Sequence, residues 1–177
     1  EHYRQWQKSQ QVSMHMEHEP GDKLFIDFAG DRLALVDPST GEVSCAEVFV
    51  ATLGYSQYTY VEALASQTKE DFIAVVERAL HYLGGVPKAL VPDNLKSAVT
   101  QADLYEPLIN PDFLDFANHY GFAVVPARSR RPQDKALVEK AVSTVYSRIY
   151  APLRHNVYHD LKTLNQVKYL KNELIFQ

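Results

Sequence analysis

Three strand-like segments, followed by an amphipathic helix and a short apolar strand, are the feature that most constrains the fold of this 177-residue chain. Residues 23–36, 43–52 and 57–64 have the alternating or nearly continuous apolar character of strands, and their short connections predict an antiparallel meander. After the polar run 66–70, residues 72–83 place apolar side chains on one helical face, and the pattern ends at Gly84 and Gly85. Because a helix-length connection precedes the apolar strand 86–92, that strand is expected to pair in parallel with an earlier one.

The remaining segments continue the alternation of helices and strands. They are a weaker helical stretch at 95–102, a helix around 113–117, a brief strand at 123–125 and a helix from 133 to about 149. The element order βββαβαβα predicts an α/β fold with a mixed five-stranded sheet and helices on both faces. We expect an N-terminal linker arm at 1–21, one core domain at 22–150 and a C-terminal helical extension at 151–177.

Several classes of protein and of site are disfavoured by composition. The single cysteine, Cys45, excludes an internal disulfide and a Cys-based zinc cluster, and it fits a reducing, cytoplasmic setting. The His-Met-Glu-His run at 15–18 lacks the spacing of a helical zinc motif. No apolar run approaches the roughly 18 residues of a membrane helix. The first residues form neither a signal peptide nor an initiator methionine, so we expect a part of a longer protein with no membrane partner.

The net charge of −4 hides a strong asymmetry along the chain. Residues 128–171 carry ten Lys and Arg against three acids, a local charge of +7, and the other residues carry −11. A solvated basic helix would explain this pattern. So would a phosphate-binding face beside an acidic, cation-binding cluster.

Three acids are not explained by the apolar pattern. Asp27 lies inside the first strand, Asp93 follows the fourth strand, and Glu139 lies among apolar residues of the last helix. Each alone has a simple explanation, respectively a bond to backbone, an Asx turn and a pair with Lys135 or Lys140. Together they could converge, and they would then repel one another unless protonated or bridged by a cation. Ligands with oxygen only favour Mg²⁺ or Mn²⁺, and two such ions would suit phosphodiester cleavage or joining.

Three segments of this sequence resemble the motifs of the DDE integrase core, which has the RNase H-like fold. They are Leu24–Gly30, Val91–Asn94 and Arg131–Lys140. The Asp-Phe-Ala-Gly form of the first motif and the run from Pro92 to Val99 most resemble the IstA-type transposases of bacterial insertion sequences. The resemblance covers about residues 22–150.

This resemblance implies an enzyme, a DNA transposase or polynucleotidyl transferase that cleaves transposon ends and transfers them into target DNA. It implies that Asp27, Asp93 and Glu139 are the catalytic residues and hold two Mg²⁺ or Mn²⁺ ions. The expected DNA-binding residues are basic side chains around the third motif: Arg128, Arg130, Arg131, Lys135 and Lys140. The resemblance further implies homo-oligomers on DNA, an AAA+ ATPase helper and a location at the bacterial nucleoid.

Two other interpretations stay open from the sequence. One is a ribonuclease H-like or resolvase-like nuclease, which would hydrolyse the phosphodiester without joining ends. The other is a non-catalytic, integrase-like scaffold that binds DNA or protein. The presence of an acid at all three positions speaks against the scaffold.

Overall fold

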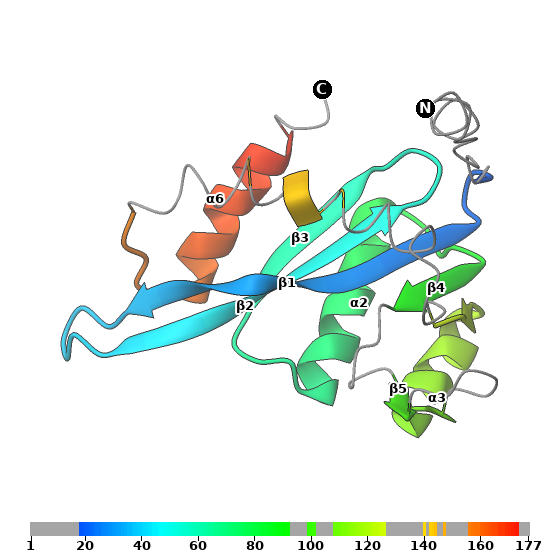
Figure 1. Ribbon diagram of the computed structural model, residues 1–177, viewed down its shortest axis with the longest axis horizontal. Coiled ribbons are helices and arrows are strands. Elements are labelled where there is room, and N and C mark those ends of the chain that lie inside the picture. The colour runs from blue at the N-terminus through cyan, green and yellow to red at the C-terminus, as the bar shows by residue number, and fades with distance from the viewer. Residues whose placement is uncertain are drawn as a thin grey trace, which may run out of the picture.

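A computed structural model describes residues 18–92, 99–101, 108–126, 140, 142–144, 147 and 156–173 of the chain, and a five-stranded sheet organises them (Figure 1). The strands lie in the order β3-β2-β1-β4-β7. Their bounds are β1 Lys23–Val36, β2 Val43–Leu53, β3 Thr59–Leu64, β4 Ala89–Pro92 and β7 Ala123–Val124. The first three form the predicted antiparallel meander. The predicted parallel pairing is also confirmed, because β4 runs parallel to both β1 and β7.

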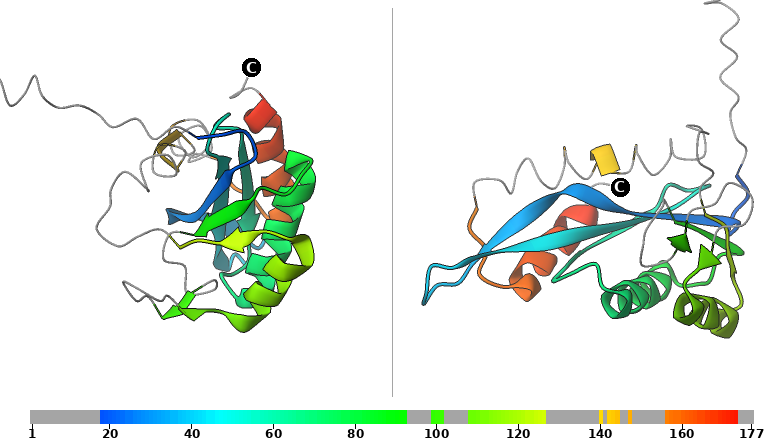
Figure 2. Two further views of the ribbon diagram at one scale, coloured as in Figure 1. Left: turned by 90° about the vertical axis from the view of Figure 1, so that its right-hand side faces the viewer. Right: turned by 60° about the horizontal axis from the view of Figure 1, so that its bottom comes forward.

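Helices α2 (Lys69–Leu83) and α3 (Pro111–Tyr120) cover one face of the sheet and lie side by side (Figure 2). Each helix begins at a side chain that accepts a bond from a free backbone N–H: Thr68 caps α2 and Asn110 caps α3. Gly84 ends α2 in the left-handed conformation at φ 74°, which glycine adopts without steric cost. Lys69 at the start of α2 pairs with Asp112 at the start of α3, which ties the two helices together.

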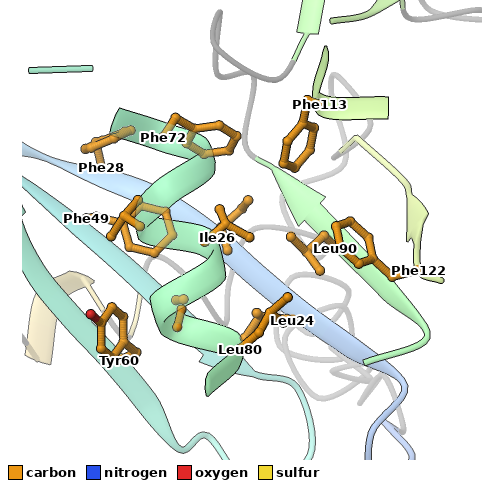
Figure 3. Close-up of a cluster of buried hydrophobic side chains, with 14 of the residues drawn as sticks. Leu24, Ile26, Phe28, Phe49, Tyr60, Phe72, Leu80, Leu90, Phe113 and Phe122 are labelled. Atoms are coloured by element: carbon orange, nitrogen blue, oxygen red, sulfur yellow. The ribbon is translucent and has the colours of Figure 1, made fainter. Parts of the chain in front are cut away.

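The main core lies between these helices and the sheet, and aromatic rings fill much of it (Figure 3). Phe72 of α2 is fully buried and contacts the rings of three other residues, Phe28, Phe49 and Phe113. The labelled side chains of this cluster are Leu24, Ile26, Phe28, Phe49, Tyr60, Phe72, Leu80, Leu90, Phe113 and Phe122. Alternate residues of β1 therefore point to this face.

The opposite face of the sheet carries a second cluster, to which helix α6 (Leu161–Glu173) contributes. Leu164 is fully buried there, and Tyr158, just before α6, forms a bridge beside Leu35 of β1. The side-chain amide of Asn165 accepts a bond from the backbone N–H of Ala63 at 2.7 Å and donates to its C=O at 3.0 Å. These bonds satisfy polar groups on the outer edge of β3, a strand at the end of the sheet.

Two sequence-based boundaries differ from the structure. The predicted helix at 95–102 is wrong over Val99–Gln101, which form strand β5 and pair with β6 (Leu108–Ile109). Adjacent β-branched Val99 and Thr100 favour a strand, which accounts for the difference. Strand β4 begins at Ala89 and not at 86, and Val86 is 44% exposed.

The other helical segments agree with the predicted pattern where the structure describes them. Lys140 and residues 142–144 are helical, and most of the predicted helix at 133–149 lies outside the described residues. Helices therefore lie on both sides of the sheet, because the segment at 142–144 is opposite α2 and α3 (Figure 2). Among the described residues, no helix is long and apolar enough to cross a membrane.

Replacing Phe72 by Ala is expected to lower the free energy of unfolding by about 3–5 kcal/mol, because it leaves a cavity among packed rings. Urea denaturation measures this change. Leu114→Ala on α3 is the control, since Leu114 is 43% exposed and should cost far less. Equal losses in the two variants would contradict the assignment of this core.

Candidate active site

Asp27 lies in the middle of β1 on the face opposite the main core. Its neighbours on that face, Phe25 and Ala29, are each 2% exposed, whereas Asp27 itself is only partly buried. Residues on either side of Asp27 in the chain, Ile26 and Phe28, point into the main core. The alternation of the strand thus places a carboxylate in an otherwise apolar row.

The carboxylate of Asp27 lies on the side of β1 that faces β4. The C=O of Lys23 accepts from Gly54 on the β2 side, and the C=O of Asp22 accepts from Ala89 on the β4 side. Successive residues of a strand alternate between its two edges, so the N–H of Phe28 points to the β4 side. That N–H donates to Oδ1 of Asp27 at 2.8 Å.

Strand β4 ends beside this carboxylate. In the parallel register of β1 and β4, Ile26 pairs with Pro92, the last residue of β4. In the sequence, Asp27 directly follows Ile26, and Asp93 directly follows Pro92. Asp93 itself lies outside the described residues, so its side chain is not placed.

A helical segment packs over the same face of the sheet. Val142 packs against Phe25 of β1 and Val91 of β4. Phe25 precedes Asp27 by two positions on the same face, and Val91 directly precedes Pro92. Lys140 lies two residues earlier, and its Nζ donates to Oε1 of Gln57 in the β2–β3 turn at 3.2 Å. The helix that contains Val142 therefore crosses the two strands whose acids the sequence analysis selected.

The other expected site residues fall outside the described part of the chain. These are Asp93, Glu139, Arg128, Arg130, Arg131 and Lys135. Of the eight expected catalytic and DNA-binding residues, the structure describes Asp27 and Lys140. It brings these two to the same side of the sheet. Within the described ranges, no three His, Cys, Asp or Glu side chains are grouped closely enough to hold a metal ion.

Two further buried acids were not selected from the sequence. Glu47 on β2 is 7% exposed, and it pairs with Arg32 at 2.6 Å and accepts from Gln67 at 2.8 Å. Glu62 on β3 is 9% exposed; Arg78 of α2 donates to both of its oxygens, and Tyr60 also donates to it. An acid inside an apolar strand is the signal that selected Asp27, and it applies equally to these two. Their arginine partners give them a structural role.

The ring of His18 packs beside Phe25 at the beginning of β1. Its Nδ1 is buried and has no hydrogen-bond partner among the described residues. Burial lowers the pKa of His18, the charge of Lys23 lowers that pKa further, and Asp22 opposes the shift. The neutral ring is therefore the form that fits the folded chain.

The integrase core domain family matches residues 17–132. A protein of Pseudomonas fluorescens assigned as the transposase of insertion sequence IS1162 is 44% identical over 166 residues, which are 94% of this chain and 30% of that protein. The transposase of insertion sequence element IS21 from Pseudomonas aeruginosa is 33% identical over 105 residues, 59% of this chain and 27% of that protein. This chain thus spans less than a third of the length of these relatives.

Solved structures share the fold. The catalytic core domain of BIV integrase gives a TM-score of 0.58 at 12% identity and covers 86% of this chain and 81% of its own. The catalytic core domain of HTLV-2 integrase, solved in complex with magnesium, gives 0.53 at 14% identity and covers 88% and 82%. A chain of the simian T-cell lymphotropic virus intasome in complex with PP2A regulatory subunit B56 gamma gives a TM-score of 0.61 at 14% identity over 86% of this chain and 49% of its own. The fold is therefore the RNase H-like fold of integrase catalytic cores.

Acidification is expected to destabilise the protein through His18. Because the pKa of His18 is lowered in the folded state, the unfolded chain takes up the proton first as the pH falls through about 6.5. The contribution of the neutral ring to the free energy of unfolding is fully present above that pH and is lost progressively below it. Urea denaturation at pH 7.5 and 5.5 should show a smaller loss of stability for His18→Phe than for the wild type.

His119→Phe is the matched control for that measurement, because His119 is an exposed histidine on α3. Its pH dependence should follow the wild type. If His18→Phe and the wild type lose equal stability on acidification, the ring of His18 does not titrate as stated.

Proposed function

This chain belongs to the integrase core domain family, and from that premise we propose that it is the catalytic core of a DNA transposase. The proposed reaction is metal-dependent cleavage of transposon ends followed by their transfer into target DNA. The observation that carries the proposal is the meeting of three elements on one face: the middle of β1 at Asp27, the end of β4 at Pro92, and the helix of Val142. Each of these elements carries or adjoins one of the three acids.

The proposed acid cluster follows from these contacts. Asp93 is the first residue after Pro92, and Pro92 is the register partner of Ile26. Glu139 is three residues before Val142, and residues three apart share a face of a helix. We therefore propose that Asp93 and Glu139 face the carboxylate of Asp27.

The chemistry of this donor set fits a hard divalent cation. Three carboxylates without cysteine or histidine are typical of Mg²⁺ or Mn²⁺ sites, and a backbone N–H already orients the carboxylate of Asp27. When bound, a pair of such ions supplies Lewis-acid stabilisation of the attacking and leaving oxygens of a phosphodiester. Asp27, Asp93 and Glu139 are the residues that would hold them.

The remaining residues of the site would bind and shield the substrate. The apolar contacts of Phe25 with Val91 and Val142 lie on the same face as Asp27 and would exclude water beside its carboxylate. The proposed phosphate-binding side chains would position the DNA backbone without reading bases: Arg128, Arg130, Arg131, Lys135 and Lys140. Lys140 is held at the β2–β3 turn, on the side of the sheet that carries Asp27.

The partners of the whole protein are part of the same proposal. We expect the protein to act on DNA in the bacterial cytoplasm at the nucleoid, as a multimer that pairs two transposon ends. The likeness to the transposase of IS21 supports an AAA+ ATPase as a helper. A nuclease that only hydrolyses is less well supported, since the relatives reported above carry transposase names.

Glu139→Gln is expected to lower DNA cleavage and strand transfer by at least about a hundredfold in the full-length transposase, because it removes a charge that would stabilise the reaction. DNA binding should persist, because the basic side chains are unchanged. Pre-cut transposon-end DNA with a plasmid target measures joining, and uncut ends measure hydrolysis. Glu70→Gln, at an exposed site on α2, is the control. Full activity of Glu139→Gln would refute the assignment, and hydrolysis without joining in the wild type would favour the nuclease.

Titration calorimetry of the 177-residue chain with Mn²⁺ is expected to give a heat of binding, and the double variant Asp27→Asn/Asp93→Asn is expected to lose it. The reason is that neutral amides replace two of the three proposed anionic ligands. Asp115→Asn, an exposed aspartate on α3, should leave binding unchanged. Undiminished Mn²⁺ binding by the double variant would place the ion elsewhere.

A further inference from the structure

The ring of His18 fills the space beside Gly54 in the β2–β3 turn. Its Nδ1 lies 3.0 Å and its Cγ 3.1 Å from the position that a Cβ would occupy on Gly54, and a Phe25 ring carbon lies 3.2 Å from the same point. Gly54 is buried, so no room is left there for a side chain. The close approach of the His18 ring accounts for a glycine at this position.

The same ring also packs on Phe25. The two ring centroids are 5.5 Å apart, and the ring planes meet at 84°, an edge-to-face arrangement. Phe25 in turn packs with Val91 and Val142. A continuous apolar contact therefore runs from His18 through Phe25 to the helix that follows Glu139 in the sequence.

A second contact reaches that helix from the β2–β3 turn. The backbone of the turn is held by bonds from Gly54 N–H to Lys23 C=O at 2.9 Å and from Gln57 N–H to Leu53 C=O at 3.0 Å. Gln57 adopts a left-handed backbone at φ 57°, and its side chain accepts the bond from Lys140. The residue directly after Glu139 is thus supported by the turn that His18 packs against.

His18 touches both supports of this helix, Phe25 directly and the β2–β3 turn at Gly54. We propose that His18 is a positioning residue: its ring fixes Phe25 and the turn, and through them it fixes the described helical residues, Lys140 and 142–144, that come directly after Glu139 in the sequence. The inference rests on the proposed function, because it assigns importance to where Glu139 lies. It gives a role to a histidine that the sequence analysis considered only as part of a zinc motif.

Within the described residues, the ring contacts its neighbours by packing. Its Nδ1 is buried and has no partner in the part of the chain that the structure describes. A phenyl ring at position 18 would keep the edge-to-face contact and remove the unpaired nitrogen. His18→Phe should therefore keep Phe25 and the turn in place, and His18→Ala should not.

The test compares His18→Ala, His18→Phe and the control His119→Ala in the 177-residue chain. Hydrogen exchange followed by mass spectrometry reports opening of the peptides that span residues 140–147. Calorimetric titration with Mn²⁺ reports the affinity of the acid cluster. For His18→Ala we expect about tenfold faster exchange and about tenfold weaker Mn²⁺ binding, the size of effect typical of residues that orient metal ligands. His18→Phe and His119→Ala should match the wild type in both measurements.

Gly54→Ala is a second variant, which tests the same contact even if His18→Ala does not fold. Its Cβ would press against the rings of His18 and Phe25 and should produce the same two changes. In the His18→Ala background, Gly54→Ala should add less than it does alone, because one of the two rings that its Cβ would press against is already gone. Circular dichroism confirms that each variant is folded.

Unchanged exchange over 140–147 in both His18→Ala and Gly54→Ala would overturn the proposal. So would His18→Phe if it behaved like His18→Ala, since that result would require the imidazole itself. Exchange is measured without metal or DNA, so it tests the positioning contact directly. A failure of the proposed function would show separately, as full cleavage and joining by Glu139→Gln.

Discussion

The parallel pairing of β1 with β4 is the interaction on which the rest of this structure depends. Strand β4 ends at Pro92, opposite Ile26, and β1 continues beyond that point to Val36. Among the described residues no strand partner reaches the N–H of Phe28 on that edge, and the carboxylate of Asp27 accepts its hydrogen bond. The end of one strand thus determines the direction of an acidic side chain on its neighbour.

The arginine-paired acids and the acid proposed for catalysis lie on opposite faces of the sheet. Towards α2, Glu47 and Glu62 are buried, and each is paired with an arginine, which offsets the cost of burying its charge. On the other face, Asp27 lies near the end of β4 and near a helix held by Phe25 and Val91. Acids that are brought together there would require a cation, and this requirement is the physical basis of the proposed phosphodiester chemistry.

Much of the fold could be predicted from the sequence, because alternation in β1 and the helical spacing of α2 report directly which side chains are buried. Prediction is weaker where local signals disagree, as the helical spacing around 95–102 disagrees with the strand preference of Val99 and Thr100. Val99–Gln101 pair with β6 as a strand, although the surrounding pattern indicated a helix. The roles of Asp27 and Glu62 could not be separated from sequence, since both are acids among apolar residues and only the fold brings Arg78 to one of them. The bond of Asn165 to the edge of β3 joins residues 102 positions apart, a separation that no local pattern reports.

The central claim is that three acids on one face of the sheet share divalent cations. A crystal structure of this chain soaked with Mn²⁺ tests it most directly, because the anomalous scattering of the metal locates each ion independently of the protein atoms. Anomalous peaks are expected roughly 2.0–2.3 Å from carboxylate oxygens of Asp27, Asp93 and Glu139, at the distances of hard oxygen ligands. Anomalous peaks at other residues, with these three carboxylates apart from one another, would contradict the claim that the acids share cations.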